Sequence, residues 1–504
     1  MSYANWIRTL IVAAVVVLLE LLCRVGVIRT GLMVPPTEMV LELYELVQNS
    51  EFWAQVFISA KSIVIAFVSA IVVGCLVALV LHALPRIRDS LEPLIASYYA
   101  LPFFVLYPLL IVLLGMNQTP IILIGFLYAV MAVVIGTMNG LDRIPAVLFR
   151  TGRVCQLSPT QQALFISLPA AAPYLFTGAK LAFGYSITGV LGSEFILSTS
   201  GLGYQISFAY NNFEDHRMYA LLLFLLTVVS ALTILMYRAQ KSVQHRSGPA
   251  NDKDGGAQTS VWSRALAGLA VVLIILATWK FATLFVSGEA LAGPEATFAQ
   301  LWQLLQTERF WGHIGETGTA LGLAIIVSCV FGTILGVLLG LNPTSSEVSE
   351  PMLVTLYSMP KVTLYPVVLL FVGVGLGSKV VFGAMYGMIP MTLLAMNAIR
   401  SMNPALRKSA RVMRLSRVQT ITTIILPATV PEIVTGIRVS FSITLLGVMI
   451  GEMFASVRGL GHLIMNSINV NDTATMMAVT ILIAVFAVSV NTGLIALDRA
   501  IHHK

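Results

Sequence analysis

The second half of this chain repeats the first half at a constant offset of 258 residues. Matching positions run without a gap from about residue 36 to about residue 220. An internal repeat of this length means that one structural module occurs twice, and it constrains the architecture before any other feature does. The matching pairs include Leu101-Pro102 with Met359-Pro360, Tyr107-Pro108 with Tyr365-Pro366, Gly125 with Gly383, Leu168-Pro169 with Leu426-Pro427, Glu194 with Glu452, and Gly201-Leu202-Gly203 with Gly459-Leu460-Gly461.

The repeated module has the composition of a membrane protein. Hydrophobic residues make up 57% of the chain and charged residues only 11%, whereas a soluble domain carries about 25% charged residues. Apolar windows close to the roughly 20 residues needed to cross a bilayer recur along both halves. They fall at about 9–28, 56–82, 96–115, 119–139, 171–193 and 217–237, and again at about 265–286, 314–340, 354–373, 377–397, 429–451 and 475–497.

These windows predict an all-α polytopic membrane protein with twelve transmembrane helices in two six-helix repeats. Because each repeat has an even number of spans, both repeats insert the same way up, and an axis along the membrane normal relates them. The predicted divisions are a first repeat at 1–237, a linker at 238–263 and a second repeat at 264–504. The linker is polar and lacks apolar periodicity, so we expect a flexible cytoplasmic tether, with a regulatory segment as the alternative.

The placement of Lys and Arg predicts the orientation in the membrane. Arg143, Arg150 and Arg153 precede the fifth window, and six basic residues precede its repeat, whereas the stretch after the first window carries four glutamates. We therefore expect both termini in the cytoplasm. The loop at 341–350 is an exception, because it carries two glutamates and no Lys or Arg.

Several classes of function are disfavoured by what the sequence lacks. The four cysteines are far apart and do not have the spacing of a metal or redox site. The chain contains no Gly-Lys dipeptide, so it lacks the phosphate-binding loop of an ATPase. No catalytic set, cofactor motif or basic segment interleaved with aromatics is evident. We expect a protein that is not itself an enzyme, needs no cofactor or metal, and binds no nucleic acid.

The loop before the fifth window of each half carries the strongest functional signal. It spans 146–173 in the first half and 404–431 in the second. A short amphipathic basic helix is followed by Leu-Ser, a second helical stretch, Leu-Pro, and another Pro four residues later. Because proline removes a backbone donor, we expect these prolines to separate a surface helix from the membrane span. A basic, partly apolar helix beneath the membrane suits docking into a groove on a cytoplasmic partner.

With this loop, the chain resembles the transmembrane subunit of ATP-binding cassette importers, and within them the nitrate, sulfonate and taurine permeases. The order of Leu-Pro near 102 and 360, Glu194 and Glu452, and the two Gly-Leu-Gly motifs carries the resemblance across both halves. The resemblance implies a multi-pass permease of the bacterial cytoplasmic (inner) membrane that imports a small polar solute by alternating access. It also implies two cytoplasmic ATP-binding subunits, a periplasmic or lipid-anchored solute-binding protein, and membrane lipid as partners.

In that family the loop forms a coupling helix with the consensus Glu-Ala-Ala, then Gly, then Leu-Pro. This chain departs from the consensus at the first two elements. We infer an ATPase partner with an acidic or polar groove, and the alternative is that the basic residues only anchor the loop to the cytoplasmic surface. The expected coupling residues are Arg150, Thr151, Gly152, Gln156, Leu157 and Pro169 in the first half, and Lys408, Ser409, Ala410, Arg414, Leu415 and Pro427 in the second.

Ionisable residues within the spans are the remaining candidates, because they are costly there and often functional. Glu194 and Glu452 lie at the outer end of the fifth span of each half, where they either face the pathway or pair with local backbone. Lys180 and Arg438 lie near the inner end of the same span, and we expect them to extend to the cytoplasmic surface.

Two other classes of protein compete with an importer subunit. Twelve spans in two parallel repeats also describe a secondary transporter of the major facilitator class. That class carries a loop rich in Gly, Asp and Arg between its second and third spans, and the loop here lacks glycine. A membrane-embedded enzyme or structural scaffold is the third possibility, and the missing catalytic set argues against it.

Overall fold

The computed structural model describes residues 3–29, 31–85, 87–88, 91, 95, 98, 101–144, 146–244, 261–284 and 291–502. Within these ranges the chain forms helices and no β-strand. Residues 245–260 of the predicted linker lie outside the described residues.

The helices recur in the same order in the two halves. Those of the first half are α1 (Tyr3–Arg24), α2 (Pro36–Val47), α3 (Ser50–Ala83), η2 (Phe103–Leu106), α5 (Tyr107–Leu114), α6 (Gln118–Asp142), α7 (Ala146–Val154), α8 (Pro159–Gln162), η3 (Ala163–Ser167), α9 (Leu168–Leu197), α10 (Leu202–Asn211) and α11 (Asp215–Gln244). Those of the second half are α12 (Val261–Ala282), α13 (Pro294–Leu305), α14 (Glu308–Gly340), α15 (Pro343–Ser358), η4 (Lys361–Leu364), α16 (Tyr365–Val372), α17 (Leu376–Ser401), α18 (Pro404–Val412), α19 (Arg417–Thr420), η5 (Ile421–Ile425), α20 (Leu426–Phe454), α21 (Leu460–Asn469) and α22 (Thr473–His502).

The same local signals shape corresponding turns in both halves. Helices α5 and α16 each begin with Tyr-Pro and end at a glycine in the left-handed region, Gly115 with φ 80° and Gly373 with φ 81°. Glycine adopts this conformation without steric cost. In the first half the side chain of Asn117 then caps α6 by accepting a hydrogen bond from the Thr119 N–H at 2.8 Å.

The core of each half is a layer of three long helices, α3, α6 and α9 in the first half and α14, α17 and α20 in the second. Small residues let these helices approach closely. A Cβ added at Gly189 would lie 2.7 Å from the Cα of Gly125, and one at Gly447 would lie 3.0 Å from the Cα of Gly383. Close packing through small residues is the usual way in which membrane helices associate.

The all-α polytopic fold is confirmed. Nine described helices are long and apolar enough to cross a membrane, and α15 with the η4–α16 segment makes a tenth if this pair, bent by 86°, is one broken span. The predicted windows at 96–115 and 265–286 contain shorter apolar helices in the described residues, Phe103–Leu114 and Val272–Ala282. The total of twelve spans stays a prediction.

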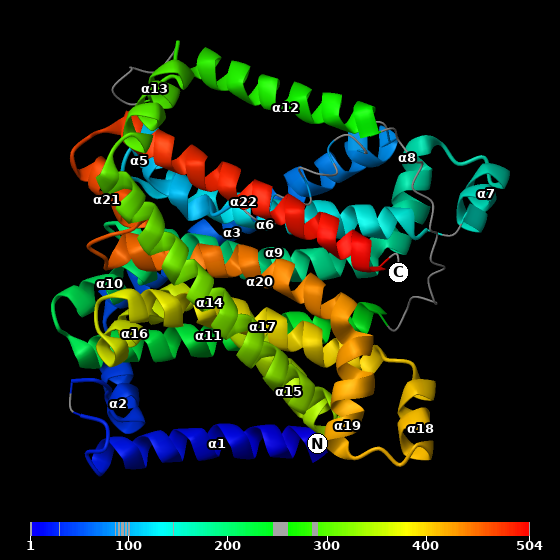
Figure 1. Cartoon of the computed structure of the whole chain (residues 1–504), viewed down its shortest axis with the longest axis horizontal. Helices are drawn as coiled ribbons and strands as arrows, with labels where there is room; N and C mark the ends of the chain where they lie inside the picture. The colour runs from blue at the N-terminus through cyan, green and yellow to red at the C-terminus, as the bar shows by residue number, and fades with distance from the viewer. Residues whose placement is uncertain are drawn as a thin grey trace.

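Helices of each half pack against helices of the other half. Helix α1 of the first half packs on α15 of the second, where the Arg8 guanidinium donates to the carbonyl oxygens of Glu347 and Val348. At the centre, η4 packs against α9, and η2 packs against α20. Figure 1 shows α7, α8, α18 and α19 at one end of the molecule, with both chain ends, and α2, α10, α13 and α21 at the other.

Candidate functional site

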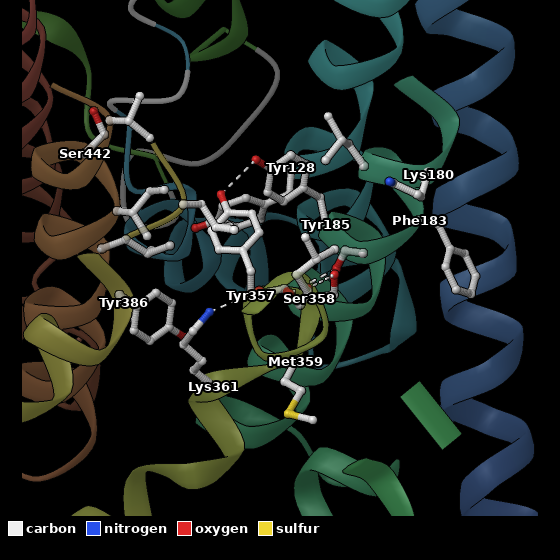
Figure 2. Close-up of a pocket in the computed structure, with 18 of the residues that line it drawn as sticks. Tyr128, Lys180, Phe183, Tyr185, Tyr357, Ser358, Met359, Lys361, Tyr386 and Ser442 are labelled. Carbon is white, nitrogen blue, oxygen red and sulfur yellow. Dashed lines mark hydrogen bonds between the residues drawn. The ribbon is translucent and has the colours of Figure 1, made fainter. Parts of the chain in front are cut away.

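A cavity of about 570 Å³ lies between the two halves. Helices α6, α9 and α11 of the first half and α15, η4, α17, α20 and α22 of the second form its wall. Tyr128 and Tyr386 occupy equivalent positions of the repeat, and so do Lys180 and Arg438. All four line the cavity, and Figure 2 shows Tyr128, Lys180 and Tyr386. The cavity therefore lies on the axis that relates the halves.

The cavity extends toward the end of the molecule that carries the α7–α8 and α18–α19 loops. Its lining residues on α11 and α22, including Thr233 and Asn491, come from the halves of those helices nearest these loops. Toward the opposite end, aromatic side chains from the two halves meet. The rings of Phe195 and Phe454 stack with their centroids 4.5 Å apart, and Tyr210 lies 5.9 Å from Phe454. The cavity thus lies toward the loop end of the molecule, and aromatic side chains pack between the halves toward the other end.

The charged side chains that line the described part of the cavity are all basic. They are Lys180, Lys361 and Arg438, and no Asp or Glu is among them. The Lys180 amine donates to Gln240 Oε1 at 2.8 Å, and the Arg438 guanidinium lies 3.5 Å from Asp498 Oδ2. Sequence reasoning noticed Lys180 and Arg438 only as surface anchors and missed their place in the cavity wall.

Lys361 is the cavity residue that sequence reasoning did not single out at all. Its side chain is 5% exposed, its amine donates to the Tyr357 carbonyl oxygen at 3.1 Å, and it lies 5.1 Å and 5.2 Å from the ring centroids of Tyr357 and Tyr386. The available signal was a departure from the repeat, because the equivalent residue of the first half is Phe103. A lysine in only one copy of an apolar turn is a cue that a residue-by-residue comparison of the halves can find.

Glu194 lies in a buried polar cluster near the end of α9, next to Phe195. It is not among the residues that line the cavity. Its carboxylate accepts hydrogen bonds from Ser59 Oγ at 2.7 Å and from the Gly203 N–H at 3.0 Å. The Leu202 N–H in turn donates to Ser59 Oγ at 2.8 Å. Glu194 and Ser59 therefore satisfy the free N–H groups at the start of α10. The Gly-Leu-Gly motif is explained by the same contact, because a side chain at Gly201, with φ 102°, would collide with this carboxylate.

The second half repeats the cluster with one addition. Thr317 Oγ1 donates to Glu452 at 2.8 Å and accepts from the Leu460 N–H at 2.8 Å. Here a buried cation joins, because Lys379 lies 3.0 Å from Glu316 Oε1 and 3.8 Å from Glu452 Oε1. Glu194 and Glu452 thus both pair with local backbone, the second of the two interpretations of the sequence. A role in the pathway stays a prediction that this geometry does not test.

The two candidate coupling loops have the same backbone geometry. Gln156 and Arg414 end the short helices α7 and α18 in the left-handed conformation, with φ of 52° and 50°. In the first loop the Gln156 N–H donates to the Arg153 carbonyl and the Leu157 N–H to the Gly152 carbonyl, which is a Schellman motif. A left-handed position favours glycine, but this chain has Gln at the position in the first loop and Arg at the one in the second.

The next turn is also the same in both loops. Ser158 and Gln161 form a capping box at the start of α8, with hydrogen bonds of 2.9 and 3.3 Å, and Ser416 and Gln419 form one at α19 with 2.9 and 3.2 Å. The chain then runs through the π-helical turns η3 and η5 directly into α9 and α20. The expectation that Leu-Pro separates a surface helix from the membrane span is therefore wrong. The π-helical turns η3 and η5 end two residues before Pro169 and Pro427, which lack a backbone donor.

The described side chains of the loops present a mixed basic and apolar surface. Arg150, Arg153, Lys408 and Arg414 are exposed, and so are several large apolar side chains. Those apolar side chains are Val147, Leu148, Val154 and Phe165 in the first loop and Leu406, Val412 and Met413 in the second. Neither loop, 146–173 or 404–431, contains an acidic residue.

The structure places the predicted coupling residues in three settings. Exposed positions are Arg150, Thr151, Gln156, Pro169, Lys408, Ser409, Arg414 and Pro427, half-buried positions are Leu157 and Leu415, and Gly152 is buried. Gly152 packs tightly on η3, because a Cβ there would lie 2.7 Å from Ile166 Cδ1. The side chain of Ala410 lies outside the described residues. The hydroxyls of Thr151 and Ser409 bond back to their own helices, to the carbonyls of Val147 and Ala405.

The family described as binding-protein-dependent transport system inner membrane component matches the chain twice, at residues 49–248 and 329–504. The taurine transport system permease protein TauC of Escherichia coli is 27% identical over 237 residues, which cover 46% of this chain and 86% of TauC. The putative aliphatic sulfonates transport permease protein SsuC of Bacillus subtilis is 27% identical over 45% of this chain and 83% of its own length. The nitrate import permease protein NrtB of a Synechocystis strain is 26% identical over 40% of this chain and 75% of its own length.

Proposed function

Because this chain belongs to the family of binding-protein-dependent transport system inner membrane components, we propose that its central cavity is the translocation pathway of an ATP-driven importer. The chain is a multi-pass membrane permease component, and the family match favours this function over a secondary transporter of the major facilitator class. Each relative matches about half of the chain, so two permease units are fused here. The proposed solute is small and polar, of the taurine, sulfonate or nitrate type named for the relatives.

Two ATP-binding subunits would dock on the two loops, one on α7 and one on α18. The matched backbone of the loops supports this proposal, since two equivalent sites fit two similar partners. The chain has no phosphate-binding loop of its own, so ATP hydrolysis would take place on those subunits. The exposed Arg150, Arg153, Lys408 and Arg414 favour a partner surface that is acidic or polar.

The continuity of the loops with α9 and α20 supports a mechanism of alternating access. Each short helix connects through a π-helical turn to a long helix that lines the cavity. The same two long helices carry Phe195 and Phe454, which close the opposite end. Closure of the ATP-binding subunits would draw the loops together, separate the two phenylalanines and open the cavity on the other side.

The proposal also includes the topology and the arrangement of partners. The loops and both termini would face the cytoplasm, with 1–237 and 264–504 as the two permease repeats and 238–263 as the tether between them. A periplasmic or lipid-anchored binding protein would deliver the solute to the end that carries α2, α10, α13 and α21.

Purification of the tagged chain from native membranes in mild detergent tests this function. We expect an ATP-binding subunit to co-purify, and Arg150→Glu or Lys408→Glu to lose it, because an acidic residue would repel an acidic groove. Arg309→Glu is the control, since Arg309 is exposed at the start of α14, far along the chain from either loop. A chain that purifies alone and moves solute down an ion gradient in liposomes would refute the proposal. Retention of the ATPase by both loop variants would refute the coupling role.

A further inference from the structure

The cavity contains a buried lysine that no acidic residue neutralises. Lys361 is 5% exposed, and its contacts within the described residues are the Tyr357 carbonyl and the rings of Tyr357 and Tyr386, none of which is acidic. An ionisable group inside a membrane protein is costly to keep and usually marks a pathway or a ligand. From this cation and its surroundings we infer that the cavity binds the anionic head of the transported solute, with Lys361 in direct contact. The inference rests on the proposed transport function and adds to it the residue that contacts the charged group of the solute.

The contacts of Lys361 leave room for a ligand. An ammonium group has three N–H donors, and the Tyr357 carbonyl takes one of them, at 3.1 Å. The rings of Tyr357 and Tyr386, with centroids at 5.1 and 5.2 Å, offer further attraction to the positive charge. Figure 2 shows the amine directed toward Tyr357, with the ring of Tyr386 beside it. These partners hold the amine in place without neutralising it, so an anion can do so.

The rest of the wall favours an oxygen-rich anion. Lys180 and Arg438 line the same cavity and each carries a positive charge, and Arg438 also pairs with Asp498 at 3.5 Å. The hydroxyls of Tyr128 and Tyr386 are buried in the wall and make no hydrogen bond of normal geometry with the described residues. A nitrate or sulfonate group presents three acceptor oxygens, and a neutral solute would leave the charge of Lys361 uncompensated.

The repeat shows that this charge is an addition to a common scaffold. The residue equivalent to Lys361 is Phe103, which is also buried. The turn therefore accommodates a large apolar side chain in one half and a cation in the other.

Anion binding to the purified complex with its ATP-binding subunits tests the inference. The probes are sodium nitrate and sodium methanesulfonate at constant ionic strength, and the neutral control is dimethyl sulfone, which has nearly the shape of methanesulfonate. The readout is the shift in apparent melting temperature as the probe is titrated, from which an apparent Kd follows. The variants are Lys361→Met and Lys361→Phe, which remove the charge, and Lys361→Arg, which keeps it.

We expect at least one of the two anions to stabilise the wild-type complex and dimethyl sulfone not to do so. Lys361→Met and Lys361→Phe should weaken the apparent affinity about tenfold or more, equivalent to about 1.4 kcal/mol, and Lys361→Arg should retain most of it. Equal binding by the wild type and both neutral variants, stabilisation by dimethyl sulfone, or no stabilisation by either anion would overturn the inference. In each of those cases the ATPase would still co-purify, whereas its absence from the wild-type preparation would instead contradict the proposed function.

Discussion

The buried cluster around Glu452 allows a test of why the Gly-Leu-Gly motif and its glutamate occur together. Thr317→Val removes one hydroxyl and keeps the volume of the side chain. In the structure that hydroxyl donates to Glu452 at 2.8 Å and accepts from the Leu460 N–H at 2.8 Å, and all three residues are buried. The substitution therefore removes one hydrogen bond to a carboxylate and leaves one backbone donor without a partner.

The expected cost follows from these two losses. An average hydrogen bond between membrane helices contributes only about 0.6 kcal/mol to stability, which is less than either of the two losses here should cost. A bond to a charged group contributes about 1.5–3 kcal/mol, and an unsatisfied buried donor costs about 1–3 kcal/mol. The Leu460 N–H belongs to the first turn of α21, where no carbonyl of the helix can accept from it. We therefore expect Thr317→Val to lower the free energy of unfolding by about 3 kcal/mol.

The measurement is denaturant-induced unfolding of the purified chain in detergent, followed by tryptophan fluorescence. Thr319→Val is the matched control on the same helix, because the exposed Thr319 hydroxyl only bonds back to the Gly315 carbonyl at 2.7 Å. This control should change stability by less than about 0.5 kcal/mol. If Thr317→Val were as stable as Thr319→Val, the cluster would not stabilise the start of α21 and the explanation of the motif would be refuted.

Two further predictions concern glycine. Gly461→Ala should destabilise the protein by about 1–3 kcal/mol in the same unfolding assay, because its Cβ would lie 2.7 Å from the Met449 carbonyl oxygen. Gly322→Ala should instead stabilise α14 by about 0.5–1 kcal/mol, because a Cβ at Gly322 would have no atom within 4 Å. Gln156→Gly should relieve about 1 kcal/mol of left-handed strain and slow amide hydrogen exchange at the end of α7, and Gln156→Ala should not, since alanine has the same strain. A faster exchange in Gln156→Gly than in the wild type would contradict this account of the loop.

The architecture could be predicted because it is encoded in signals that are local or repeated. The offset between the halves and the length of the apolar windows depend on residues close together in the chain or on simple self-comparison. Hydrophobicity alone does not determine how a broken span such as α15–η4–α16 lies in the membrane, and the number of spans could not be settled from it.

The functional geometry depends on contacts between residues far apart in the chain. Sequence placed Glu194 at a helix end but could not choose between a pathway and a local role, because its partner Ser59 is on another helix. Sequence reasoning did not single out Lys361, because Tyr386, whose ring centroid lies 5.2 Å from its amine, is on another helix, α17. The sequence alone therefore determined the duplicated membrane module, the position of its candidate coupling loops and its family resemblance. Only the tertiary structure decided which side chains face the central cavity, because the facing side of a membrane helix is set by the helices packed around it and not by its own composition.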